Sequence, residues 1–197
     1  YEEEGSGTPV IFIPGWAGNT AFYDHQMPYF AKRYRAITYD PRSQGRSSKT
    51  LENNHYMQHG RDLRAFMDAL GLRNVALVAL SAGCFDIYGY LREFGTDNLR
   101  ALVFIDNPPR GVAVRKGDWG GFADWEEAAA FMKAVFADMR GLIPNLIAPM
   151  MKREMRQDEL DWASEQLLKT PNYAAALTSA DYLFSDYTAE ARMVDGK

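Results

Sequence analysis

Short apolar runs alternate with helical patterns along the first half of the chain, and this alternation limits the fold more than any other feature. The runs are residues 10–13, 35–39, 74–79 and 102–105, and each ends in turn-forming residues. Helical patterns lie between them. Because the runs are apolar on both faces, they predict a mostly parallel sheet covered by helices on both sides. The predicted fold class is therefore α/β.

The second half of the chain shows no further clear strand. Asp124 and Glu127 have the spacing of a capping box that opens a helix. We expect that helix to end at Gly141. Further helices are predicted around residues 160–167 and across 173–187. A helical segment therefore follows the α/β part of the chain.

Composition narrows the function classes. The 197 residues carry a formal net charge of −4 without a basic stripe, which argues against nucleic acid or an anionic membrane as a partner. No apolar run approaches the roughly 20 residues that span a bilayer. Cys84 is the only cysteine, so an internal disulfide is excluded, as in a reducing compartment. We expect a cytoplasmic protein that acts on a small molecule without a cofactor or metal, with the oligomeric state left open.

Ser81 lies on a tight turn between the apolar run that ends at Ala79 and the helix that begins at Cys84. Such a turn pushes the hydroxyl outward, and the first amides of the helix point toward the same place. The turn requires small neighbours, and Ala82 and Gly83 are small. Ser81 is therefore the candidate nucleophile, and the alternative is that it only caps the helix. Cys84 is a rival nucleophile whose ordinary role would be that of a small apolar core residue.

Three motifs resemble those of the α/β-hydrolase superfamily. Residues 79–83 (Ala-Leu-Ser-Ala-Gly) resemble its nucleophile elbow. Residues 14–18 (Pro-Gly-Trp-Ala-Gly) resemble the loop after its third strand, and 40–47 the loop after its fourth. The motifs occur in the family's order and spacing. Two positions depart from the pattern, because Ala79 replaces the first elbow glycine and Ser43 replaces a loop glycine.

The resemblance implies a serine hydrolase in which Ser81 is the nucleophile. It assigns the oxyanion hole to the backbone amides of Trp16 and Ala82, which would stabilise the developing negative charge. Gly15 lets the loop before Trp16 turn without a Cβ in the way. Outside this resemblance, residues 14–15 also suit an ordinary turn at the end of a strand.

The same resemblance divides the chain into three parts. Residues 1–110 would form the N-terminal part of the core, 111–190 a helical cap (lid), and 191–197 a return toward the rest of the core. On this basis we expect the chain to lack the first strand or strands and the last strands of the fold. Residues 193–197 then resemble the lead-in to a strand that is cut short.

The catalytic base is missing from the expected place. The family's chain order is serine, then acid, then histidine, but the three histidines, His25, His55 and His59, all precede Ser81. None matches the catalytic position. Asp106, at the end of the last apolar run, is an alternative position for the acid, and it also suits a turn. We expect the usual acid and histidine to lie beyond the sequence given.

Two function classes fit these residues. The first is a serine hydrolase of small, fairly hydrophobic esters or related acyl compounds, as the resemblance to esterases and cofactor-free haloperoxidase-like enzymes implies. The second is a catalytically inactive, receptor-like ligand-binding protein or an inactive fragment, which the missing histidine favours. Large apolar residues of the predicted cap either pack on the core or line a pocket over the serine: Phe122, Trp125, Phe131, Phe136, Met139, Met150, Met151 and Met155.

Overall fold

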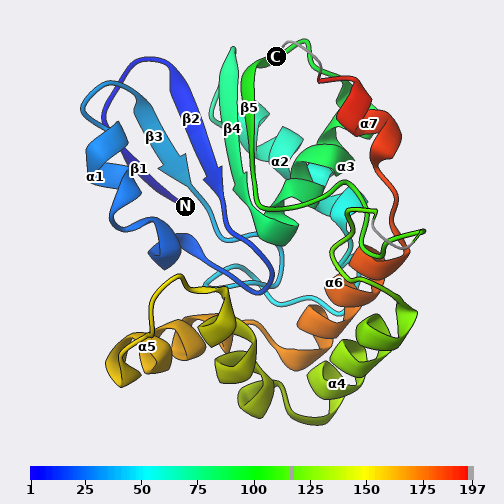
Figure 1. Ribbon diagram of the computed structural model, residues 1–197. Helices are drawn as coiled ribbons and strands as arrows, with labels where there is room; N and C mark the ends of the chain where they lie inside the picture. The colour runs from blue at the N-terminus through cyan, green and yellow to red at the C-terminus, as the bar shows by residue number, and fades with distance from the viewer. Residues whose placement is uncertain (116–117, 195–197) are drawn as a thin grey trace.

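The computed structural model describes residues 1–115 and 118–194 and contains a five-stranded sheet with the order β1-β3-β2-β4-β5 (Figure 1). The strands are β1 (Glu2–Glu4), β2 (Pro9–Ile13), β3 (Arg35–Thr38), β4 (Val75–Leu80) and β5 (Leu99–Ile105). β2 to β5 run parallel, and β1 pairs antiparallel with β3. The four predicted apolar runs therefore form the predicted mostly parallel sheet, and the α/β class is confirmed.

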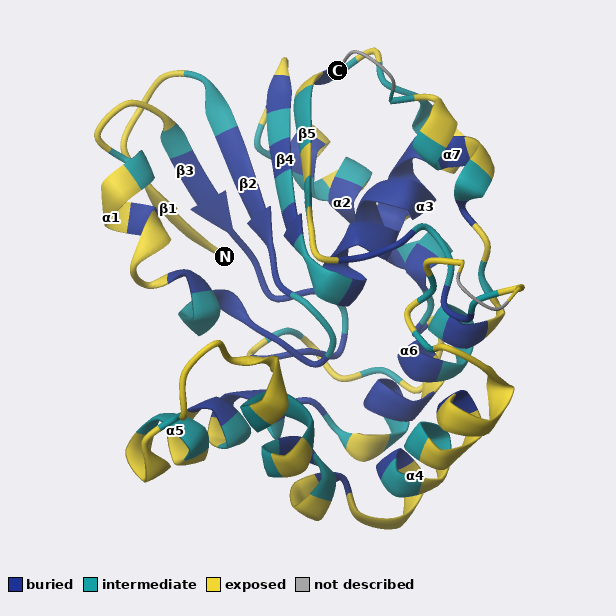
Figure 2. Ribbon diagram, viewed as in Figure 1, coloured by how far each residue is buried: buried dark blue, intermediate teal, exposed yellow. Residues whose placement is uncertain are grey.

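Helices connect the parallel strands. The 3-10 turn η1 (Thr20–Tyr23) and α1 (Gln26–Phe30) join β2 to β3, α2 (Tyr56–Ala69) joins β3 to β4, and η2 (Ser81–Gly83) with α3 (Cys84–Phe94) joins β4 to β5. α2 and α3 cover one sheet face over the largest apolar cluster (Figure 2). On the other face α1 and η1 pack against β2, with Phe12, Tyr23 and Met27 buried together.

The pattern between the first two apolar runs predicts one helix over residues 22–32, and this prediction is wrong in its bounds. A continuous helix from residue 22 would place Pro28 in its interior, where proline lacks the N–H for the ladder and collides with the preceding turn. The structure avoids this conflict because α1 begins at Gln26, so that Pro28 lies in its first turn. Asn19 caps the separate turn η1 by accepting a hydrogen bond from Ala21 N.

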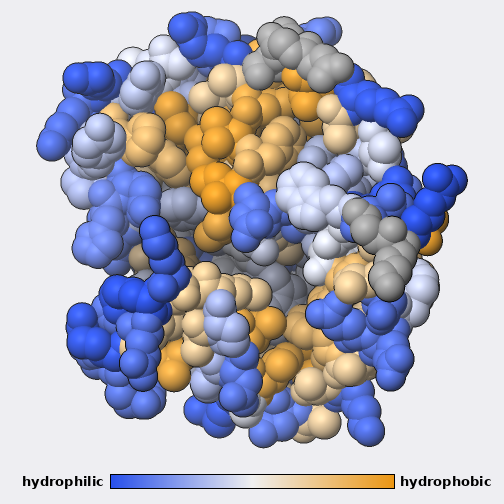
Figure 3. Space-filling model, viewed as in Figure 1, coloured by the Kyte–Doolittle hydropathy of each residue, from blue (hydrophilic) through white to orange (hydrophobic). Residues whose placement is uncertain are grey.

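In the part of the chain that the structure describes, one face of β5 is not covered by a helix, whereas the sequence predicted a sheet covered on both sides. Val103 and Ile105 are 45% and 40% exposed, although both are apolar. Apolar surface accordingly lies over β2, β4 and β5 in the space-filling view (Figure 3). Within residues 1–115 and 118–194, the face is covered beside β2 and left open beside β5.

A layer of helices lies across the carboxyl ends of the parallel strands (Figure 1). This helical layer consists of α4 (Trp125–Ile147), the turn η3 (Ala148–Met150), α5 (Gln157–Leu167) and α6 (Asn172–Phe184). The predicted capping box is confirmed, because Asp124 Oδ1 accepts from Glu127 N at 2.9 Å. The predicted end at Gly141 is wrong, because α4 continues through it. The break lies instead at Asp138, whose φ of −158° is not helical and whose carboxylate accepts from Gly141 N.

After the helical layer the chain returns to the α/β core. The short helix α7 (Thr188–Arg192) packs on α3, and Glu190 accepts two hydrogen bonds from the Arg92 guanidinium. The Arg92 guanidinium also lies 4.3 Å from the ring centre of the buried Tyr187. Residues 195–197, most of the expected lead-in to a further strand, lie outside the described residues. The boundaries at 110 and 190 stay predictions.

No helix among the described residues has both the length and the apolar character needed to cross a membrane.

Two glycines bring α2 and α3 into backbone contact. A Cβ added at Gly60 would lie 2.3 Å from Tyr90 N, and one added at Gly89 would lie 2.3 Å from Tyr56 O. The helices therefore approach more closely than any side chain at these two positions permits. This contact brings the helix that follows the candidate nucleophile close to the rest of the core.

We predict that Gly89→Ala destabilises the fold by about 1–3 kcal/mol, because the added methyl group must push two backbones apart. Urea unfolding of the two proteins measures the difference. Glu93→Ala, also on α3 but exposed, is the control and should change the midpoint little. Equal urea midpoints for Gly89→Ala and the parent chain would show that α2 and α3 tolerate a methyl group at Gly89, and would contradict the prediction.

Candidate active site

The turn between β4 and α3 holds Ser81 in a strained backbone conformation. β4 ends at Leu80, and Ser81 then adopts a φ of +50° before η2 leads into α3. A non-glycine residue in this left-handed region costs about 1 kcal/mol or more, and such residues concentrate at functional sites. Ser81 is half-buried rather than enclosed. The expectation of a serine on a sharp strand-to-helix turn is therefore met by the geometry.

The loop after β2 lies directly beside this turn. β2 and β4 are parallel neighbours, with Ile13 opposite Ala79, so both strands end at the same edge. A Cβ added at Gly15 would lie 3.3 Å from the Cβ of Ser81, and one added at Gly83 would lie 2.3 Å from Pro14 O. Two absent side chains thus allow two loops to pack backbone against backbone.

The amides expected to form an oxyanion hole belong to these two loops. Trp16 follows Gly15, and its N–H donates to no acceptor in residues 1–115 or 118–194. Ala82 is the second residue of η2, where backbone N–H groups at the start of a helix lack intrahelical acceptors. Both residues therefore lie on segments in contact with Ser81. Their role as oxyanion donors stays a prediction.

Asp106 occupies the corresponding position on the next strand. Leu80 of β4 pairs with Ile105 of β5, so Asp106 follows β5 as Ser81 follows β4. Asp106 also has a positive φ, +54°, and its side chain is exposed. Among the described residues it makes no hydrogen bond to Ser81 or to a histidine. Its role as the acid stays a prediction.

None of the three histidines makes a hydrogen bond to Ser81 among the described residues. His25 is exposed beside α1, and His55 caps α2 by accepting a hydrogen bond from Gln58 N. His59 is buried within α2, and its Nδ1 lies 2.9 Å from Asp86 Oδ1 on α3. His55 and His59 therefore have roles in helix capping and in the core, whereas His25 lies at the surface beside the cavity described below.

The His59–Asp86 pair is fully buried, and its titration is strongly perturbed. Burial alone lowers the pKa of His59, but the charge of Asp86 and the hydrogen bond outweigh burial, so the pKa lies above its usual value. Burial also raises the pKa of Asp86, against the opposing effect of His59. Tyr39, at the end of β3, has its pKa raised by burial and by the charge of Asp86. Asp86, a charged residue in a mainly apolar helical segment, was the sequence signal for this cluster, and the sequence analysis did not identify it.

Cys84 is not suited to act as the nucleophile. The thiol is buried, and Sγ donates to Ala79 O at 3.4 Å. Burial raises the pKa of Cys84 to about 12. Because the thiolate is the reactive form, such a thiol is inert near neutral pH.

Asp40 braces the loop after β3. Its two carboxylate oxygens accept from Thr20 N at 2.7 Å and from Arg46 N at 2.6 Å. Gly45 is required beside it, because a Cβ there would lie 2.4 Å from Asp40 Oδ2. This loop is joined in this way to the segment that follows β2.

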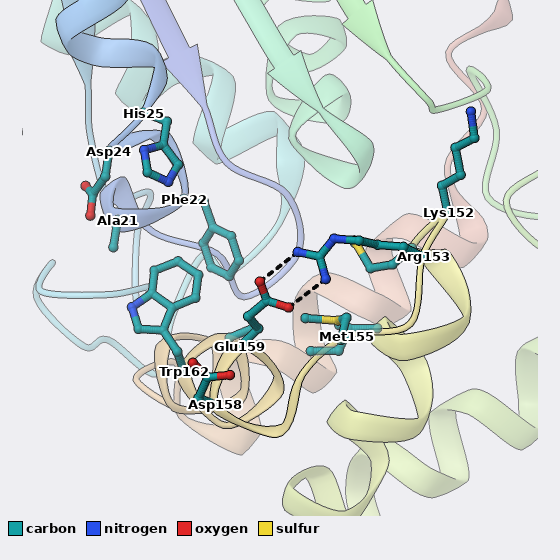
Figure 4. Close-up of a pocket in the computed structure, with 13 residues that line it drawn as sticks. Ala21, Phe22, Asp24, His25, Lys152, Arg153, Met155, Asp158, Glu159 and Trp162 are labelled. Atoms are coloured by element: carbon teal, nitrogen blue, oxygen red, sulfur yellow. Dashed lines mark hydrogen bonds and ion pairs between the residues drawn. The ribbon is translucent and has the colours of Figure 1, made fainter.

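A cavity of about 860 Å³ lies between η1 and the helical layer (Figure 4). Phe22 and Trp162 form part of its wall, with ring centres 5.3 Å apart, and Arg153 pairs with Glu159 beside them. Ser81 is not among the lining residues, so this cavity is separate from the serine turn.

The large apolar residues expected in the cap divide between several environments. Met151 and Met155 line the cavity. Met139 is buried and Phe131 packs against the ring of Trp16. Others are exposed at the surface: Trp125, Phe136 and Met150. Phe122 packs in turn against Phe131, so part of the set clusters beside the loop of Trp16. That some of these residues line a pocket over Ser81 stays a prediction.

Comparison with known proteins agrees with this architecture. The family model for the alpha/beta hydrolase fold matches residues 8–196. A putative non-heme chloroperoxidase from Synechocystis sp. is 32% identical over 110 residues, which are 55% of this chain and 40% of the relative. The non-heme chloroperoxidase CPO-A1 of Kitasatospora aureofaciens is 34% identical over 110 residues, with the same two shares. The matched stretch thus spans less than half the length of these relatives.

Solved structures are similar over nearly the whole chain. A bromoperoxidase from Bacillus anthracis superposes with a TM-score of 0.89 at 24% identity, covering 98% of this chain and 72% of that one. An esterase from Exiguobacterium antarcticum has a TM-score of 0.87 at 21% identity, covering 96% and 70%. At these identities the likeness establishes the fold. The chain therefore covers part of the fold, as expected from the sequence.

The buried histidine pair generates a pH-dependent prediction. Because the folded-state pKa of His59 lies above its unfolded value, its protonation stabilises the fold below about pH 6.5, and this contribution is lost as pH rises through the folded pKa. Asp86→Asn should abolish or reverse this slope, because burial alone lowers the pKa of His59, and it should destabilise the protein by roughly 3 kcal/mol at pH 6, because one partner of a buried pair is lost. Urea unfolding between pH 6 and 9 measures both effects.

Asp68→Asn is the matched control, since Asp68 lies on the outer face of α2 in an exposed pair with Arg64. It should leave the pH dependence as in the parent chain. An Asp86→Asn variant with an unchanged pH slope would contradict the assignment of the titration to His59.

Proposed function

Because this chain belongs to the alpha/beta hydrolase fold family, we propose that it carries the nucleophile and oxyanion hole of a serine hydrolase for small, fairly hydrophobic esters or related acyl compounds. The observation that carries the proposal is the positive φ of Ser81 on a turn packed against the loop of Gly15. A serine that only capped a helix would not require this strain. Fold alone does not define an activity, so the proposal rests on this turn.

In the proposed reaction, Ser81 Oγ attacks the acyl carbonyl carbon and passes its proton to a base. The carbonyl oxygen becomes an oxyanion that accepts hydrogen bonds from Trp16 N and Ala82 N. The leaving alcohol takes a proton as the intermediate collapses to an acyl-serine ester. Water then attacks that ester, releases the carboxylic acid and restores the hydroxyl. Asp106 is a proposed position for the acid that orients the base.

The substrate class is inferred from relatives and from the apolar surroundings. Proteins named non-heme chloroperoxidase and esterase share this family or its fold. Phe131 packs against the ring of Trp16 in the loop beside Ser81, and this apolar contact suits a substrate with a hydrophobic acyl or alcohol part. We also propose a cytoplasmic location, residues 111–190 as a helical cap, and catalysis without a cofactor.

A second candidate function is ligand binding without catalysis. It is favoured by one observation, namely that none of the histidines His25, His55 and His59 reaches Ser81 among the described residues. A serine without a base is a weak nucleophile near neutral pH. The two candidates differ in whether Ser81 reacts covalently.

We predict that a fluorophosphonate probe labels the full-length protein at Ser81, because the proposed nucleophile elbow would present its hydroxyl beside the proposed donor amides of Trp16 and Ala82. Mass spectrometry of the digested protein locates the label. Ser81→Ala should abolish labelling and reduce the hydrolysis of p-nitrophenyl esters by about a thousandfold or more.

Ser164→Ala is the control, since this half-buried serine donates to Leu160 O within α5. It should retain full labelling. Undiminished labelling of Ser81→Ala would rule out Ser81 as the nucleophile, and absence of labelling in the parent protein would favour the ligand-binding alternative.

A further inference from the structure

The loop that carries Trp16 is bound by the helical layer as well as by the α/β core. Three hydrogen bonds join it to the segment around the α5–α6 junction. Thr170 Oγ1 donates to Ala17 O at 2.9 Å, Trp16 Nε1 donates to Ala175 O at 3.1 Å, and Asn19 Nδ2 donates to Gln166 O at 3.0 Å. The partners are about 150 positions apart in the sequence, so tertiary packing alone brings them together.

Ala17 is the residue of this loop most enclosed by the helical layer. It is 1% exposed and shares an apolar cluster with Val135, Met139 and Leu167. Its φ of +56° is strained for alanine. Such a conformation persists only where the surroundings over-determine it. Thr170, itself 3% exposed, supplies the buried partner of its carbonyl.

The hydrogen bond from Thr170 is the first of two that lead to the amide of Trp16. Ala17 C=O belongs to the same planar peptide unit as Gly18 N–H, and that N–H donates to Gly15 O at 3.0 Å. Gly15 C=O in turn belongs to the same peptide unit as Trp16 N–H. Because each peptide unit is rigid, fixing the direction of Ala17 C=O constrains the direction of Trp16 N–H.

We propose that Thr170 is a positioning residue that orients the Trp16 amide for the oxyanion through these two peptide units. This inference rests on the proposed function, because it assigns the purpose of the Trp16 amide. The helical layer is thereby a part of the catalytic framework, in addition to any role as a cover. Hydrogen bonds in such a chain also polarise one another, which strengthens the terminal donor.

Thr170→Val tests the proposal, because valine keeps the shape of threonine and removes the donor. In the full-length protein we expect kcat for p-nitrophenyl esters to fall about tenfold with KM within about twofold, since misorienting one oxyanion donor weakens mainly the transition state. Amide hydrogen exchange in the peptide that contains residues 15–18 should become about tenfold faster, since a buried hydrogen bond is lost. Thr170→Ser should restore both values. If Thr170→Val does not fold, Thr170→Ala replaces it.

Thr38→Val is the matched control. Thr38 is also buried, but its hydroxyl donates to Phe12 O within the sheet at 3.0 Å. It should leave kcat and the exchange of residues 15–18 unchanged. A general loss of stability would affect both variants, whereas loss of positioning affects Thr170→Val alone.

The outcomes separate this inference from the proposed function. Unchanged exchange of residues 15–18 in Thr170→Val overturns the inference, whatever the hydrolysis. The inference is also overturned if Thr170→Val shows faster exchange of residues 15–18 but an unchanged kcat, provided that fluorophosphonate labels Ser81 of the parent protein. If Ser81 of the parent protein is not labelled, the proposed function fails, and the catalytic purpose of Thr170 fails with it.

Discussion

Backbone-to-backbone contact between the loop after β2 and the turn after β4 is the constraint from which the candidate site follows. Gly15 and Gly83 make this contact possible, because a Cβ at Gly83 would overlap Pro14 O and one at Gly15 would crowd Ser81. The parallel register of β2 and β4 brings both loops to the same sheet edge. Ser81 then adopts a left-handed conformation that the surrounding packing stabilises.

The helical layer completes this arrangement from the opposite side. Ala17 is enclosed by α4, α5 and α6, while Gly15, two residues earlier in the same loop, touches the serine turn. The loop of residues 15–18 therefore contacts both the helical layer and the turn of Ser81. On the far side of Ser81, the close contact of α2 with α3 and the buried His59–Asp86 pair hold the helix that begins at the turn.

Much of the fold was predictable because its signals are local. The apolar runs, the strand-to-helix turn at Ser81 and the capping box at Asp124 each depend on residues a few positions apart. The errors arose where a neighbour overrides such a signal. Pro28 delayed the start of α1, and Asp138 rather than Gly141 interrupts α4 because its carboxylate caps the following turn. The open face beside Val103 could not be seen in a run whose composition resembles that of a fully buried strand.

Local chemistry in the sequence was sufficient to specify an α/β sheet and a serine on a sharp turn, because period, turn residues and small neighbours act over short distances. The partners of that turn depend on contacts across the whole chain, such as Thr170 with Ala17 and His59 with Asp86. These pairs could not be predicted from a sequence pattern, because each forms only when separate elements pack together. The orientation of the Trp16 amide thus depends on how the sheet and the helical layer pack together. The position of Ser81 at the end of β4, in contrast, was predictable from the residues of the strand, the turn and the start of the helix.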